Sequence, residues 1–108
     1  MPFQIQTVVT FSDQDVLDLI ITGVEGGIGY WSTLHQYTPD EFNTVVSEDC
    51  DGSEVVPIRL TKEVCYKGLN LMAQKQPRHF DDFVNDNYDA ETGDVFIQFC
   101  LLGDVVYG

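Results

Sequence analysis

Helical periodicity in residues 13–25 sets the strongest limit on how this chain folds. The apolar residues recur there at three- and four-residue spacing, which places them on one face of a helix: Val16, Leu17, Ile20, Ile21 and Val24. Ser12 precedes the segment as a predicted N-cap, and Asp15 follows three positions later to complete a capping box. Gly26 and Gly27 either end the helix or bend it, because each glycine costs about 1 kcal/mol in a helix interior. The sequence therefore predicts one helix that packs by a single face.

The rest of the chain alternates extended segments with further helical patterns. We expect strands at 3–10, 42–48 and 54–60, a hairpin turn at 50–53, and a return of Val105 and Val106 to the sheet edge. Helices are expected at 62–76, 79–87 and 91–102. Thr61 is the expected N-cap of the first, Pro77 its stop and Gly103 the expected C-cap of the last, and Gly68 is a predicted point of close approach. A chain of 108 residues, 44% of them hydrophobic, can form one core and not two. The predicted fold is α+β: a single domain over residues 1–108, with a short, mostly antiparallel sheet packed against three to four helices.

Acidic side chains far outnumber basic ones, with 18 Asp and Glu against 5 Lys and Arg and a net charge of -13. No cation precedes Arg59, and all five lie between Arg59 and Arg78. Phosphate contacts need clustered Lys and Arg, so the charge disfavours direct binding to nucleic acid or to an anionic membrane. The first residues lack a basic region and a long apolar run, and we expect a cytoplasmic protein.

The residues that could carry chemistry form no catalytic or metal-binding motif. The three cysteines are far apart without a C-x-x-C spacing, which predicts buried free thiols: Cys50, Cys65 and Cys100. The two histidines lack partners at helical spacing, and the serines lack a nucleophile elbow. The acids match no EF-hand or H-E-x-x-H pattern. We therefore expect a protein that is not an enzyme, with no cofactor and no metal site.

The most unusual string runs from Glu25 to Trp31 and contains three glycines within four positions. Gly26 and Gly27 would let backbone amides approach a ligand, and Tyr30 and the chain's only Trp could stack on a planar group. Alternatively, the glycines form a tight turn and the aromatic residues belong to the core. The string lacks the G-K-[ST] ending of a P-loop and the strand-to-helix context of a dinucleotide fold.

Three polar side chains elsewhere are further candidates for ligand binding. Arg59 and Lys62, beside the start of the predicted helix 62–76, could hold one phosphate together with free helix amides. The alternative is that the basic residues of this segment solvate an exposed face. Gln98 is the lone amide in an apolar run and needs hydrogen-bond partners if it is buried, so it either supports the fold or faces a pocket.

Two strings of this sequence resemble the paired signatures of a family of small, acidic, largely uncharacterised proteins of bacteriophages and prophages. They are Glu25–Trp31 and, near the end, Asp94–Gln98 followed by Leu102–Gly108. The likeness spans nearly the whole chain. It implies a phage accessory protein that acts against host defences in the infected cell, and it brings no catalytic residue or cofactor with it.

Three functions are compatible with these features. In the first, a homo-oligomer sequesters a nucleotide-type immune signal, with these residues around it: Gly26, Gly27, Tyr30, Trp31, Gln98, Tyr107 and either Arg59 or Lys62. In the second, the carboxylates imitate DNA phosphates and occlude the basic groove of a CRISPR effector or restriction enzyme. In the third, the chain is a minor structural or assembly protein of a virion. We favour the first hypothesis, which predicts that Tyr30, Trp31, Gln98 and Tyr107 converge on one concave site.

Overall fold

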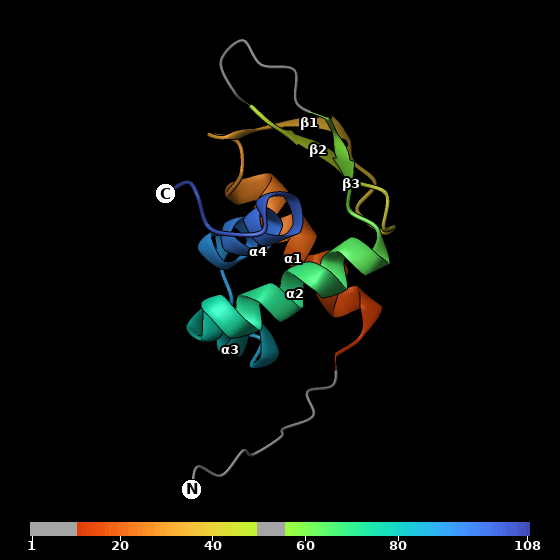
Figure 1. Cartoon of the computed structure of the whole chain (residues 1–108). Helices are drawn as coiled ribbons and strands as arrows, with labels where there is room; N and C mark the ends of the chain where they lie inside the picture. The colour runs from red at the N-terminus through yellow and green to blue at the C-terminus, as the bar shows by residue number, and fades with distance from the viewer. Residues whose placement is uncertain (1–10, 50–55) are drawn as a thin grey trace, which may run out of the picture.

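The computed structural model describes residues 11–49 and 56–108 of the chain, which form four helices and a three-stranded antiparallel sheet (Figure 1). In chain order the elements are α1 (Asp13–Gly26), β1 (Ser32–Gln36), β2 (Val45–Glu48), β3 (Ile58–Arg59), α2 (Lys62–Lys75), α3 (Pro77–Val84) and α4 (Ala90–Leu102). The sheet lies against one end of the helices, and its strand order is β1-β2-β3. The predicted α+β fold is confirmed.

Helix α1 begins and ends where its sequence predicts. The Ser12 hydroxyl accepts a hydrogen bond from the Asp15 amide at 3.2 Å, and the Asp15 carboxylate accepts one from the Ser12 amide at 2.8 Å. At the other end, the Gly27 amide donates to the Gly23 carbonyl at 2.9 Å. The buried face is wider than the predicted one, because Leu19 is fully buried as well.

The remaining helices also start and stop at residues with clear local causes. The Thr61 hydroxyl caps α2 by accepting from the Val64 amide, and Asp89 caps α4 through the Thr92 amide. Pro77 ends α2 and opens α3, where its missing N–H is not needed, so α3 begins earlier than predicted. Gly103 ends α4 with a φ of 76°, a left-handed conformation that favours glycine.

The sheet differs from the prediction in two respects. Strands β2 and β3 lie within the expected segments, but β1 was not expected as a defined strand; it pairs with β2 in the register Ser32↔Glu48. The predicted return of Val105 and Val106 to the sheet edge is wrong, because this segment is extended chain that binds the side chain of Gln98 instead. The strand predicted at 3–10 and the turn predicted at 50–53 lie outside the described residues.

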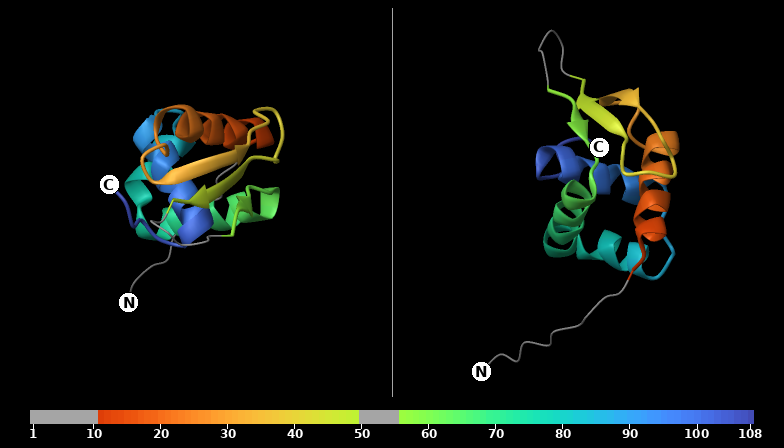
Figure 2. Two further views of the ribbon diagram at one scale, coloured as in Figure 1. Left: turned by 90° about the horizontal axis from the view of Figure 1, so that it is seen from above. Right: turned by 90° about the vertical axis from the view of Figure 1, so that its right-hand side faces the viewer.

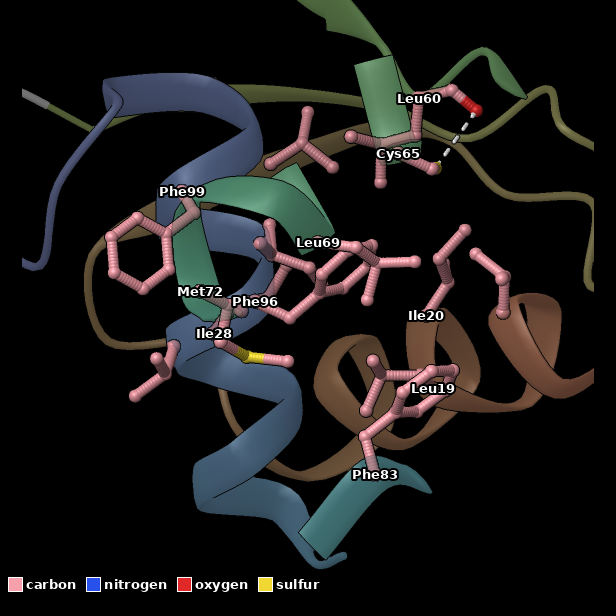
Figure 3. Close-up of a cluster of buried hydrophobic side chains, with 14 of the residues drawn as sticks. Leu19, Ile20, Ile28, Leu60, Cys65, Leu69, Met72, Phe83, Phe96 and Phe99 are labelled. Atoms are coloured by element: carbon pink, nitrogen blue, oxygen red, sulfur yellow. Dashed lines mark hydrogen bonds between the residues drawn. The ribbon is translucent and has the colours of Figure 1, made fainter. Parts of the chain in front are cut away.

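Helix α4 is the centre of the core, with α1 and α2 packed against it (Figures 1 and 2). Side chains from all three helices meet in the cluster drawn in Figure 3. Phe83 of α3 also belongs to the cluster, as does Leu60, which directly follows β3. Phe96, Ile97 and Phe99 of α4 have at most 1% of their surface exposed. Burial on so many sides explains why α4 is the most apolar of the helices.

Glycines set how closely the helices approach α4. A Cβ atom built on Gly93 would lie 2.5 Å from the Gly23 amide nitrogen, so the backbones of α1 and α4 touch at this point. On the other side of α4, a Cβ atom on Gly68 would lie 2.4 Å from the Sγ atom of Cys100. The close approach expected at Gly68 is therefore present, and a second one joins α1 to α4.

The α1–α4 contact predicts a strong effect of one added methyl group. Gly93→Ala should lower the free energy of unfolding by about 1–3 kcal/mol or more, because neither backbone can move away without opening the core. In the absence of a clash the same change would raise stability by about 1 kcal/mol through helix propensity. Gly29→Ala is the matched control, since a Cβ atom there meets no atom within 4 Å.

Urea denaturation of both variants measures the effect. A Gly93→Ala protein at least as stable as the wild type would contradict the described contact.

Candidate functional site

The carboxylate of Asp94, which is only 8% exposed, joins the two signature strings. Its Oδ1 atom accepts hydrogen bonds from Trp31 Nε1 at 2.7 Å and from Gln98 Nε2 at 3.0 Å. Its Oδ2 atom accepts from the Tyr30 hydroxyl at 2.7 Å. A buried carboxylate is costly unless donors replace its lost water, and three donors do so here. The glycine-aromatic string is thereby attached to α4.

Gln98 uses its amide group completely within the chain. Its Oε1 atom accepts from the backbone amides of Val106 at 2.8 Å and Tyr107 at 2.9 Å. Its Nε2 group donates to Asp94 and, at 3.1 Å, to the Tyr107 carbonyl. A primary amide offers two donors and two acceptor positions, so all four are occupied. The side chain thus acts like a strand partner for the C-terminal segment.

Tyr107 completes the cluster by contacting both the string and the sheet. Its ring stacks on that of Trp31, with centroids 5.5 Å apart and planes inclined by 8°. Its hydroxyl donates a hydrogen bond to the Glu48 carboxylate at the end of β2. Trp31 itself is 1% exposed. The C-terminal segment therefore covers one face of the only tryptophan.

The four side chains predicted to converge do lie together, but as a packed junction with Tyr30, 59% exposed, at its surface. The Trp31 N–H and the whole Gln98 amide already have partners, and the stacking position over Trp31 is taken by Tyr107. Gly26 and Gly27 face α4: Cβ atoms built on them would lie 3.1 Å from the Ala90 Cβ atom and 2.6 Å from its carbonyl oxygen, respectively. Their small size permits helix packing. Nucleotide binding by this cluster stays a prediction.

Arg59 lies in β3 and Lys62 begins α2, and in Figure 1 both elements lie away from the C-terminal end of the chain. The Arg59 guanidinium donates to the side chain of Asn43 and, at 3.5 Å, to its carbonyl. Lys62 forms a 3.0 Å ion pair with Asp13, and this hydrogen bond raises the pKa of the ammonium group. The structure thus does not bring the two candidate phosphate ligands to the predicted pocket.

The other reactive side chains are held in structural contacts. Cys65 is buried. Burial raises the pKa of the Cys100 thiol, and the neighbouring Cys65 thiol raises it further, which disfavours the reactive thiolate form of Cys100. His79 Nδ1 lies 3.2 Å from the Thr92 hydroxyl, and His35 Nε2 lies 2.8 Å from the Ser47 hydroxyl. The described residues include no group of three potential metal ligands. The prediction for Cys50 lies outside those residues.

A second cluster, which the sequence analysis did not identify, lies where the start of α1 meets the end of α3. A cavity of about 190 Å³ is lined there by Phe11, Asp15, Phe83, Val84, Asp86 and Tyr88. Burial, and then the charges of Asp18, Asp86 and Asp15, raise the pKa of the Tyr88 hydroxyl. The aromatic residues and acids of this region were visible in the sequence, but their meeting depends on the contact of Phe83 in α3 with Phe11, which precedes α1.

Comparison with known proteins identified no relative of this chain. No family model, curated protein or solved structure matches the chain. The resemblance to phage proteins therefore stays a prediction that rests on the two strings. Within 11–49 and 56–108, the helices include none long and apolar enough to cross a membrane.

The Tyr30–Asp94 hydrogen bond predicts a specific loss of stability at high pH. Partial burial, the hydrogen bond and the Asp94 charge raise the pKa of Tyr30 from 10.0 to about 12. Because the folded-state pKa is the higher one, the stabilising contribution is complete below pH 10.0 and is lost as the pH rises through about 12. Tyr30→Phe lacks this contribution at every pH.

The difference in free energy of unfolding between the wild type and Tyr30→Phe isolates this hydroxyl from the other tyrosines. It should be constant from neutral pH to about 10.0 and then decrease. A difference that stays constant up to pH 12 would show that the hydroxyl does not bind Asp94 in solution.

Proposed function

We propose that the chain is a non-enzymatic binding protein that places its acidic surface on a basic, nucleic-acid-binding surface of another protein and occludes it. The observation that carries this proposal is the unbalanced acidic region around Tyr88. Asp15 and Asp86 line the cavity beside Tyr88, no Lys or Arg is among its described lining residues, and the charges of Asp18, Asp86 and Asp15 add to burial in raising the pKa of the Tyr88 hydroxyl. A basic partner would supply the positive charge that the cavity lining lacks.

The chain's own cations do little to neutralise its surface. Lys62 pairs with Asp13, and Lys75 pairs with Asp104 at 3.5 Å. Arg59 binds the uncharged Asn43. These are the ion pairs of the described residues, and the net charge of the whole chain is -13. Such a field accelerates association with a basic partner and repels nucleic acid from the same site.

Sequestration of a nucleotide by the glycine string has weaker support. A base would have to displace Tyr107 from Trp31 or enter from its other side, and its phosphates would approach the buried carboxylate of Asp94. Arg59 and Lys62, one of which was expected to hold the phosphate, are bound to Asn43 and Asp13 instead. The acidic-surface proposal requires none of these groups to change partner.

The resemblance to phage proteins gives the partner a biological class. A phage protein that occludes a basic groove would protect phage DNA by blocking a host nuclease, such as a restriction enzyme or an RNA-guided nuclease. This proposal needs no catalytic group, cofactor or metal in the chain. It also needs no second copy of the chain, whereas the nucleotide pocket was expected in a homo-oligomer.

The test measures DNA binding by purified restriction and RNA-guided nucleases in a mobility-shift assay with the chain added. We expect inhibition at low salt that weakens steeply as salt rises, because the Debye length is only about 8 Å at physiological ionic strength. The double variant Asp18→Asn/Asp86→Asn should inhibit about three- to tenfold less well. The double variant Asp40→Asn/Glu41→Gln loses the same charge elsewhere and should inhibit almost as well as the wild type.

Three results would contradict the proposal. The first is DNA binding that is unaffected by the chain at low salt across both classes of nuclease. The second is inhibition that does not change with salt. The third is a thermal-shift response to a cyclic or ADP-ribose-type nucleotide that is lost in a folded Trp31→Phe variant, which would favour the nucleotide pocket.

A further inference from the structure

The cavity beside Tyr88 has a lining unlike that of the rest of the core. Three aromatic rings and two carboxylates surround it, and Val84 completes the wall. It lies between the start of α1, the end of α3 and the connection from α3 to α4, which approach one another in the right-hand view of Figure 2. No Lys or Arg is among the lining residues. The lining therefore combines apolar ring surface with negative charge.

The aromatic residues are held in fixed relative positions. The Phe11 and Phe83 rings meet edge to face with centroids 5.6 Å apart, and the Phe83 and Tyr88 centroids are 6.0 Å apart. The face of an aromatic ring carries partial negative charge and attracts cations within about 6 Å. The chain already uses this chemistry nearby, where Lys62 Nζ lies 6.0 Å from the ring centroid of Tyr66, a neighbour of Phe11.

The two carboxylates flank the rings in different ways. Asp15 is fixed by its capping bond with the Ser12 amide. The backbone amide of Asp86 donates a hydrogen bond to the Phe83 carbonyl at 3.2 Å, and the Asp86 backbone adopts a φ of 57°. Within the described part of the chain, the Asp86 carboxylate has neither a hydrogen bond nor an ion pair. Asp86 is thus a charge at the rim of the cavity that is available to a ligand.

Size and charge together restrict the ligand. Pockets for drug-sized molecules measure roughly 300–1,000 Å³, so a cavity of about 190 Å³ suits one side chain better than a nucleotide. The carboxylates would repel a phosphate. A guanidinium group matches both features, because its plane stacks on aromatic rings and its N–H groups pair with carboxylate oxygens in a fixed geometry.

We propose that this cavity receives the guanidinium group of an arginine on the basic protein partner. The inference rests on the proposed function and identifies the point at which the partner is anchored. The arginine stacks against Tyr88, beside the nearly buried Phe83, and pairs with Asp86, while Asp15 adds a second negative charge to the lining. The surrounding acidic face then contacts the other basic residues of the partner.

The test is a titration of the isotope-labelled full chain with the peptide acetyl-Gly-Arg-Gly-amide, followed by amide NMR shifts. We expect shifts centred on residues 11–15 and 83–88, with affinity in the millimolar range. The peptide with citrulline, a neutral isostere of arginine, should bind at least fivefold more weakly, and the lysine peptide should bind about threefold more weakly.

Matched variants tie the binding to the cavity. Asp86→Asn and Tyr88→Leu should each weaken arginine-peptide binding about threefold or more, and Asp40→Asn, which removes a charge elsewhere, should leave it unchanged. The same spectra show whether each variant is folded. Shifts spread evenly over the acidic surface, equal binding of the citrulline peptide, or equal binding of tetramethylammonium would overturn the assignment to arginine.

The pocket and the proposed function can fail separately. If nucleases are inhibited but Asp86→Asn and Tyr88→Leu inhibit as well as Asp40→Asn, the anchor is overturned and the acidic-surface function stands. If the arginine peptide binds the cavity but no nuclease is inhibited, the anchor stands and the proposed partner class is wrong.

Discussion

The buried carboxylate of Asp94 is the interaction on which the rest of the junction depends. It binds Trp31, 63 residues earlier in the sequence, as well as Tyr30 and Gln98. Without it, the buried N–H group of Trp31 would lose its partner, at a cost of about 1–3 kcal/mol for such a group. Gln98 in turn holds the C-terminal segment against the tryptophan. One side chain of α4 thus links the end of α1, the start of the sheet and the end of the chain.

Local sequence signals predicted much of this structure, because caps and glycine or proline stops depend on neighbouring residues. The capping box of α1, the Thr61 cap and the left-handed Gly103 are of this kind. The convergence of Tyr30, Trp31, Gln98 and Tyr107 was also predicted. The role of Asp94 was not, because among many acids nothing local distinguishes the buried one, although its position one helical turn before Gln98 in an apolar run is a usable signal. The helix contact of Gly23 and Gly93 likewise requires knowledge of which helices pack.

The candidate binding site lies in a different part of the molecule from the one that the sequence-based hypothesis predicted. The most unusual string, with its glycines and its tryptophan, fills its own hydrogen bonds and packs against α4. The candidate binding surface is instead the acidic, aromatic cavity where α1 begins and α3 ends. The glycine-aromatic string thus has a structural role, and the cavity with the Asp86 carboxylate, unpaired within the described residues, is where a partner is proposed to bind.

A double-mutant cycle between Asp94 and Trp31 tests most directly that the string is a structural junction. Asp94→Ala, Trp31→Phe and the double variant are compared with the wild type by the free energy of unfolding. We predict a coupling energy of at least about 1 kcal/mol, because the loss of the carboxylate matters less once the indole N–H is gone. A coupling within about 0.3–0.5 kcal/mol of zero, the range for independent sites, would show that the two strings are not joined through Asp94.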